Sequence, residues 1–127
     1  MSKVTIEMLR CSRDPRGFVF EPLEADSLPF QKNAHVVMTE PGAIRGNHYH
    51  REAAEITVVV GPALVRFREE GHVWDVQVLD GEAQRFIIPP GVSHAFQNVG
   101  NKPMLLAAFS TALFNATNPD VVRDQLI

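Results

Sequence analysis

The sequence has few of the features that mark secreted, membrane-bound or nucleic-acid-binding proteins. Its single cysteine, Cys11, cannot form a disulfide within the chain, so a reducing, cytoplasmic location is expected. No apolar run is long enough for a signal peptide or a helix that spans a bilayer. Lysine and arginine form no run and the formal net charge is −3, which argues against nucleic-acid and membrane partners.

Long helical patterns, internal repeats and low-complexity tracts are also missing. The 127 residues have room for one domain, and nine prolines and eight glycines divide them into short segments with β-type alternation. This pattern predicts an all-β sandwich or barrel. A short helix is predicted only over residues 119–127, with Asn118 as its N-cap. The predicted strands cover residues 4–8, 18–22, 30–39, 55–60, 63–69, 73–79, 85–88, 94–98 and 104–110.

Three of the five histidines fall in two short segments that suit a metal site. His48 and His50 are two residues apart, so on a strand both imidazoles point to the same side. Glu55 lies an odd number of residues further on, and it joins them only if a turn around residues 51–54 starts a new strand. A Pro-Pro-Gly turn at residues 89–91 leads to His94. Three imidazoles and a carboxylate suit Zn²⁺, Fe²⁺, Mn²⁺, Ni²⁺ or Co²⁺, whereas a lone His-x-His pair is more often a surface feature.

These two segments resemble the two sequence motifs of the cupin superfamily. Residues 42–61, Gly-x5-His-x-His-x4-Glu-x5-Gly, are similar to the first motif, with one residue fewer than usual before the last glycine. Residues 89–98, Pro-x-Gly-x2-His-x3-Asn, are similar to the second, whose leading Gly81 stands two residues further upstream than usual. The resemblance implies a single cupin domain over residues 1–127. Its fold would be a double-stranded β-helix, or jelly-roll barrel, with a core at about residues 28–110. It also implies one divalent transition metal, zinc in the first place, bound by the histidines and the glutamate.

Two further stretches are similar to the nucleotide-sugar 3,5-epimerases. Residues 14–21 resemble their Asp-x-Arg-Gly-Phe-x-x-Glu segment, and residues 42–49 resemble their Gly-x-x-Arg-Gly-x-His-Tyr segment. The resemblance implies that Arg16 and Arg45 contact a nucleotide or sugar, because a guanidinium can grip a diphosphate at two points. Salt bridges at the surface or in a dimer interface would explain the two arginines equally well.

The run Arg-Gly-Asn-His-Tyr-His at residues 45–50 is closer still to another group of cupins. It resembles the cupin domain of capsular-polysaccharide enzymes that act on UDP-4-keto sugars with zinc. Similar free-standing cupins also occur as polyketide cyclases. Cupin relatives commonly pair N-terminal strands across a two-fold axis, which implies a homodimer formed through residues 4–8.

The chain departs from the metal-free epimerases at two positions. Those enzymes use the histidine that matches His48 as a base and a tyrosine from a late strand as an acid. The one tyrosine here, Tyr49, lies between His48 and His50 and therefore points to the opposite face of the strand. Glu55 stands roughly where those enzymes carry a lysine. Both departures favour a metal-dependent reaction.

His35 lies on a predicted strand and is expected either to line the cavity as a base or to be a satisfied core histidine. The leading hypothesis is an enzyme in which a metal polarises the carbonyl of a small keto substrate while His35 or Glu55 moves a proton. A polyketide cyclase, an Fe(II) dioxygenase and a non-catalytic small-molecule binder are the alternatives, because cupins host many functions.

Overall fold

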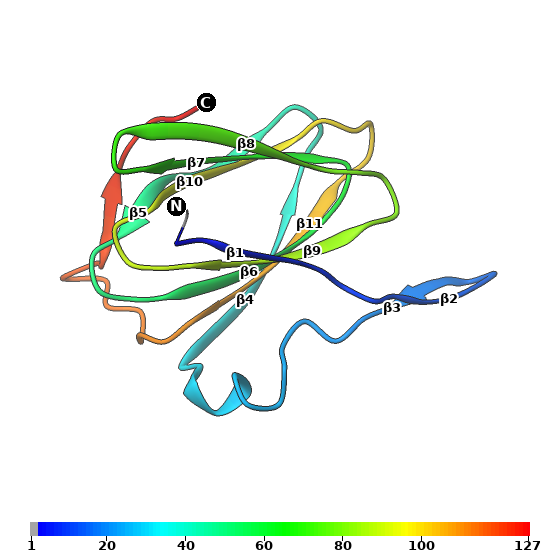
Figure 1. Cartoon of the computed structure of the whole chain (residues 1–127), viewed down its shortest axis with the longest axis horizontal. Coiled ribbons are helices and arrows are strands. Elements are labelled where there is room, and N and C mark those ends of the chain that lie inside the picture. The colour runs from blue at the N-terminus through cyan, green and yellow to red at the C-terminus, as the bar shows by residue number, and fades with distance from the viewer. Residues whose placement is uncertain (1–2) are drawn as a thin grey trace.

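The computed structural model describes residues 3–127, which form antiparallel strands and one turn of 3-10 helix (Figure 1). Prolines and glycines in the connections keep the strands short, as the sequence pattern predicts. In chain order the elements are β1 (Thr5–Met8), β2 (Ser12–Asp14), β3 (Gly17–Val19), η1 (Leu28–Phe30), β4 (Asn33–Thr39), β5 (Ile44–His50), β6 (Glu55–Val60), β7 (Ala63–Glu69), β8 (His72–Val78), β9 (Ala83–Ile88), β10 (Ser93–Asn98), β11 (Met104–Ser110) and β12 (Val121–Arg123).

Two five-stranded sheets face each other and enclose the core. One sheet has the strand order β1-β9-β6-β11-β4 and the other has the order β12-β5-β10-β7-β8. Along β7 the side chains alternate, so that Val65 and Phe67 are fully buried, as expected for strands with one wet face. They pack with Phe86 and Ile88 from the other sheet. The prediction of an all-β cupin barrel is confirmed.

Part of the outer face of the first sheet is covered by the N-terminal segment. Leu9, Cys11 and Phe20 pack against the buried cluster of Val58, Ala83 and Ala107. The buried guanidinium of Arg85 binds the carboxylates of Glu7 and Glu24 and fixes this segment to β9. The β2–β3 hairpin projects from the barrel (Figure 1). The predicted strand over residues 18–22 overlaps β3 only at its start, because β3 ends at Val19.

The prediction of a helix over residues 119–127 is wrong. Residues Val121–Arg123 form β12, which pairs antiparallel with β5, Val121 lying opposite His50 and Arg123 opposite His48. Two successive valines favour an extended backbone, and the free edge of β5 offers hydrogen bonds that a terminal helix would forgo.

The homodimer implied by the cupin resemblance stays a prediction. β1 pairs with β9 of its own chain, and within residues 3–127 its other edge has no neighbouring strand. That edge is where strand pairing between two copies would occur. No helix in the described part of the chain has the length and hydrophobicity needed to cross a membrane.

Candidate metal centre

The four predicted ligands come together inside the barrel. His48 and His50 lie on β5, Glu55 is the first residue of β6, and His94 is the second residue of β10. One ligand atom from each lies within 4.8 Å of the corresponding atoms of the other three. His94 is brought next to residues far from it in the sequence because β10 pairs with β5 and places His94 opposite His48.

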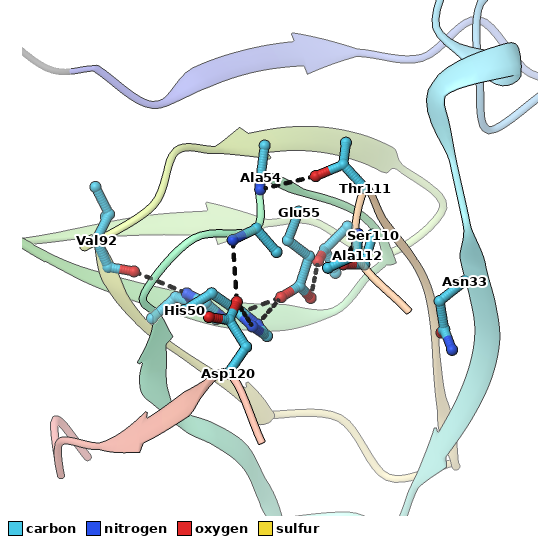
Figure 2. Close-up of polar contacts among 12 residues, drawn as sticks. Asn33, His50, Ala54, Glu55, Val92, Ser110, Thr111, Ala112 and Asp120 are labelled. Carbon is cyan, nitrogen blue, oxygen red and sulfur yellow. Dashed lines mark hydrogen bonds and ion pairs between the residues drawn. The ribbon is translucent and has the colours of Figure 1, made fainter. Parts of the chain in front are cut away.

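The turn at residues 51–54 resolves the odd spacing between His50 and Glu55. β5 ends at His50 and β6, which belongs to the other sheet, begins at Glu55. The Ala54 N–H donates to the Thr111 hydroxyl at 3.2 Å (Figure 2). The N–H groups of residues 52 and 53 donate to the Asp120 carboxylate. Because the chain changes sheet here, Glu55 faces the same interior as the two histidines.

Gly46 lets β5 approach β10 next to the ligands. A Cβ at this position would lie 2.7 Å from the carbonyl oxygen of His94, and the Gly46 φ angle is +86°. The register slips beside it, so that His94 pairs with His48 and Ala95 with Gly46. The residue between them, Asn47, has a φ angle of +58°, the backbone of a β-bulge, which commonly re-aims side chains near functional sites.

Two of the ligands, Glu55 and His94, are oriented by a hydrogen bond on the side away from the centre. The Glu55 Oε1 atom accepts a hydrogen bond from the Thr57 hydroxyl (2.8 Å), which leaves Oε2 facing the histidines. The His94 Nδ1 atom lies 3.0 Å from the Val92 carbonyl oxygen, to which it donates, so that Nε2 faces inward. Metal-binding histidines are commonly held in this way.

The atoms at the centre of the cluster fit a divalent metal. The Oε2 atom of Glu55 lies 2.5 Å from Nε2 of His50 and 3.5 Å from Nε2 of His94. Both nitrogens are buried, yet neither forms a well-aligned hydrogen bond, and such orphaned groups are costly unless something binds them. A metal ion would satisfy them together with the carboxylate oxygen.

The electrostatics of the cluster favour the metal-binding form of two donors, His48 and Glu55, and the protonated form of a third, His50. Burial, with help from His94, lowers the pKa of His48 to about 4, so this imidazole is neutral at pH 7. Burial alone would raise the pKa of Glu55, but the close contacts of its carboxylate with His50 and His94 outweigh burial and hold the pKa well below its usual range. Burial likewise opposes the charge on His50, but the Glu55 carboxylate outweighs it and raises the pKa of His50.

The cluster opens into a cavity of about 530 Å³, a typical size for a small-molecule site. Arg45 and His35 line the same cavity as the candidate ligands. Much of the remaining wall is apolar. The apolar lining includes Val37, Phe96, Leu106, Leu113 and Phe114.

His35 is an exposed residue of β4 that lines the cavity, so the alternative of a core histidine is wrong. The strand register places it in one row with Ala108 and Thr57. Its Nδ1 atom lies 3.1 Å from the side-chain oxygen of Asn33. Because this oxygen accepts, Nδ1 carries the proton and Nε2 keeps a lone pair. The catalytic role of His35 stays a prediction.

The two predicted substrate arginines lie in different places. Arg45 lines the cavity, where its guanidinium donates to the Thr39 hydroxyl (3.3 Å) and the Met38 carbonyl (3.1 Å). Arg16 lies at the tip of the projecting β2–β3 hairpin and pairs with Asp14 at 2.7 Å. It does not line the cavity of its own chain, and its contact with a substrate stays a prediction.

Three residues that contact the ligands or His35 were not identified from the sequence. Thr57 is two residues after Glu55 and shares its strand face, a spacing that could have revealed it. Asn33 stands in the same relation to His35. Asp120 is brought to the site only by the pairing of β12 with β5, which no local spacing indicates.

Residues 12–122 match the model of the polysaccharide biosynthesis C-terminal domain family. The chain belongs to this family. It is 32% identical over 111 residues to a UDP-2-acetamido-2,6-beta-L-arabino-hexul-4-ose reductase of Pseudomonas aeruginosa, covering 84% of this chain and 29% of the relative. It is 27% identical to the probable low-salt glycan biosynthesis epimerase Agl13 of Haloferax volcanii, covering 94% of this chain and 85% of the relative. The family is thus one of cupins similar to nucleotide-sugar epimerases and isomerases.

Solved structures support the same placement. The capsular polysaccharide assembling protein CapF of Staphylococcus aureus superposes with a TM-score of 0.70 at 25% identity, covering 93% of this chain and 34% of CapF. The sugar 3,4-ketoisomerase QdtA of Thermoanaerobacterium thermosaccharolyticum, in complex with TDP, superposes with a TM-score of 0.73 at 15% identity, covering 95% of this chain and 88% of QdtA. The QdtA likeness shows the shared fold. This chain spans only about a third of the length of CapF and of the reductase.

Proposed function

We propose that this protein is a metal-dependent epimerase or isomerase that enolises a nucleotide-linked keto sugar. The observation that carries the proposal is the convergence of His48, His50, Glu55 and His94 on a cavity that His35 and Arg45 also line. The names of its relatives support the substrate class: one reduces a hexul-4-ose, and QdtA has been crystallised with TDP-4-keto-6-deoxyglucose.

A divalent metal held by these four side chains would supply Lewis acidity at the substrate carbonyl, which acidifies the neighbouring C–H. The three histidines are then ligands and are not available as bases. Both Glu55 oxygens are also engaged, Oε1 by Thr57 and Oε2 in the centre of the cluster. Glu55 therefore fits the role of ligand better than that of a base, although either role needs its negative charge.

His35 is the best-placed group to take the proton from the carbon beside the carbonyl. Asn33 fixes its tautomer with Nε2 as an acceptor. Adjacent strands lie about 4.8 Å apart, and β11 lies between β4 and β6. His35 and Thr57 therefore belong to backbones roughly 10 Å apart, a spacing that leaves room for a sugar ring in between.

Arg45 is suited to bind an oxygen-rich part of the substrate. Its Nε and Nη2 atoms are held by Thr39 and Met38, which fixes the plane of the guanidinium. Within residues 3–127 its Nη1 atom forms no hydrogen bond with protein and can donate to a phosphate or sugar oxygen.

The apolar cavity wall favours one second candidate, a cyclase that acts on an aromatic polyketide. Val37, Phe96 and Leu106 would contact flat, apolar rings as readily as a deoxysugar. In that case the metal site would act on the carbonyl of a polyketide, and Arg45 would not need to bind a diphosphate.

Hydrogen exchange in D₂O tests the proposal. Metal-loaded protein incubated with UDP- and TDP-linked 4-keto-6-deoxy sugars is expected to introduce deuterium at the carbon next to the carbonyl, as followed by NMR. Glu55→Gln should slow exchange at least about 10-fold because it removes the charge of a ligand. Asp80→Asn, which changes an exposed carboxylate outside the cavity, should exchange like the wild type. Absence of exchange with every keto sugar, together with turnover of an aromatic polyketide or consumption of O₂, would refute it.

A further inference from the structure

We propose that Asp120 is a positioning residue for the metal centre: its carboxylate fixes the turn between His50 and Glu55 and orients the His50 ring. The inference rests on the proposed metal centre and assigns a role to a residue outside the ligand set. It depends on three features of the structure, which are the bonds to the turn, the contact with His50 and the anchoring of Asp120 itself.

Asp120 binds three successive N–H groups of the turn. Its carbonyl oxygen accepts from Arg51 (2.9 Å), while its Oδ1 and Oδ2 atoms accept from Glu52 and Ala53, each at 3.0 Å. One residue therefore fixes most of the four-residue connection between two ligands. Because Glu55 reaches the histidines only through this connection, its position relative to His50 depends on Asp120.

The same carboxylate also lies beside the His50 ring (Figure 2). Its Oδ2 atom is 3.8 Å from Nδ1, whereas the other ring nitrogen, Nε2, is 2.5 Å from Glu55 Oε2. A separation of 3.8 Å is too long for a direct hydrogen bond. It still allows a charge to favour the proton on Nδ1, which leaves the lone pair on Nε2 for a metal. A carboxylate behind a histidine ligand is a common way to fix the tautomer and ring orientation.

Asp120 is well placed to hold the turn because the tail around it is bound to the ligand strand. β12 pairs with β5 directly after Asp120, so that Val121 lies opposite His50. Further along, the Asp124 N–H donates to the Asn47 carbonyl, and the Asn47 side-chain oxygen accepts from Leu126 and Ile127. The carboxylate and the histidines it orients therefore belong to one hydrogen-bonded unit.

Both carboxylate oxygens are used, so an amide is not an equivalent replacement. In Asp120→Asn only one side-chain atom can accept, and the NH₂ group would face either Glu52 N–H or Ala53 N–H. The substitution also removes the negative charge beside His50. The expected effect is a looser turn and a less well-oriented ring, both of which weaken metal binding.

The test is the affinity of metal-free protein for Zn²⁺, measured by competition with a chromophoric chelator, together with the visible spectrum of the Co²⁺ form. Asp120→Asn is expected to bind Zn²⁺ about 10- to 100-fold more weakly than the wild type and to change the Co²⁺ absorption. The control is Asp75→Asn, which removes another paired carboxylate on β8, outside the cavity, and should match the wild type within about 2-fold.

Thermal unfolding of the metal-free proteins separates positioning from general stability. A lower Tm of Asp120→Asn with wild-type Zn²⁺ affinity and an unchanged Co²⁺ spectrum would overturn the inference, because the residue would then only stabilise the barrel. If Asp120→Asn does not fold, Asp120→Ser, which keeps one acceptor without the charge, is judged by the same affinity criterion. Failure of both to fold would also overturn it. Absence of binding to the wild type would instead refute the proposed metal centre.

Discussion

His48 and His50 are two residues apart on one strand, yet their proton affinities are shifted in opposite directions. Burial and the neighbouring His94 lower the pKa of His48, whereas the Glu55 carboxylate overcomes burial and raises that of His50. The sequence predicts the identity and convergence of both, because alternation on a strand places them on one side. It does not predict their difference, which arises from the atoms that the fold places around each ring.

The role of His35 can be separated from that of the ligands by substitution. His35→Gln should slow deuterium exchange into a keto sugar about 10²- to 10⁴-fold, the usual contribution of a general base. Zn²⁺ affinity should stay at the wild-type value, because His35 is not among the four candidate ligands. Exchange at the wild-type rate in His35→Gln would show that another group takes the proton.

Among the elements, β12 shows most clearly where a prediction from sequence ends. Asn118 and Pro119 satisfy the local rules for the start of a helix, but the tail becomes a strand because β5 has an edge to pair. Strands β6, β7 and β10 have their turn residues in the neighbouring sequence, and β7 also has its alternation, so their bounds are predicted closely. Pairing with β5, which is distant in the sequence, makes the tail a strand, and no local pattern in the tail indicates this pairing.

The tail also carries a stabilising contact near His94. The Asp124 carboxylate accepts a hydrogen bond from Ser93 (2.6 Å) and forms an ion pair with Arg68. The Ser93 hydrogen bond, and then Arg68, lower the pKa of Asp124 below its ordinary value of 3.8. Because the pKa is lower in the folded state, this stabilisation is complete above about pH 3.8 and is lost as the pH falls through the folded-state pKa.

Asp124→Asn should therefore lower the free energy of unfolding by about 1 kcal/mol at pH 7, with a smaller difference from wild type near pH 3. Urea denaturation of the metal-free proteins at pH 7, 4.5 and 3 measures this, with Asp80→Asn as an exposed control. A difference that stays constant across this range would show that the charge of Asp124 contributes nothing to it.

At the scale of the whole molecule, the candidate ligands come from both sheets. His48, His50 and His94 lie on β5 and β10 of one sheet, and Glu55 lies on β6 of the other. The barrel and this convergence follow from the short strands and the two cupin-like motifs. The position of the projecting hairpin that carries Arg16 does not follow from these patterns, because it depends on contacts outside the barrel core.

A metal that joins the two sheets should stabilise the folded state by about 4 kcal/mol when the free metal concentration is 1,000 times the dissociation constant.

The metal content of the purified protein, determined by elemental analysis, tests the central claim most directly. Wild-type protein from metal-replete cells should contain close to one divalent transition metal ion per chain. His50→Ala and His94→Ala should each lose most of it, because every ligand contributes strongly to affinity. His72→Ala, which removes an exposed histidine at the start of β8, should keep the full content. Metal-free wild-type protein, or unchanged metal content in both ligand variants, would contradict the account.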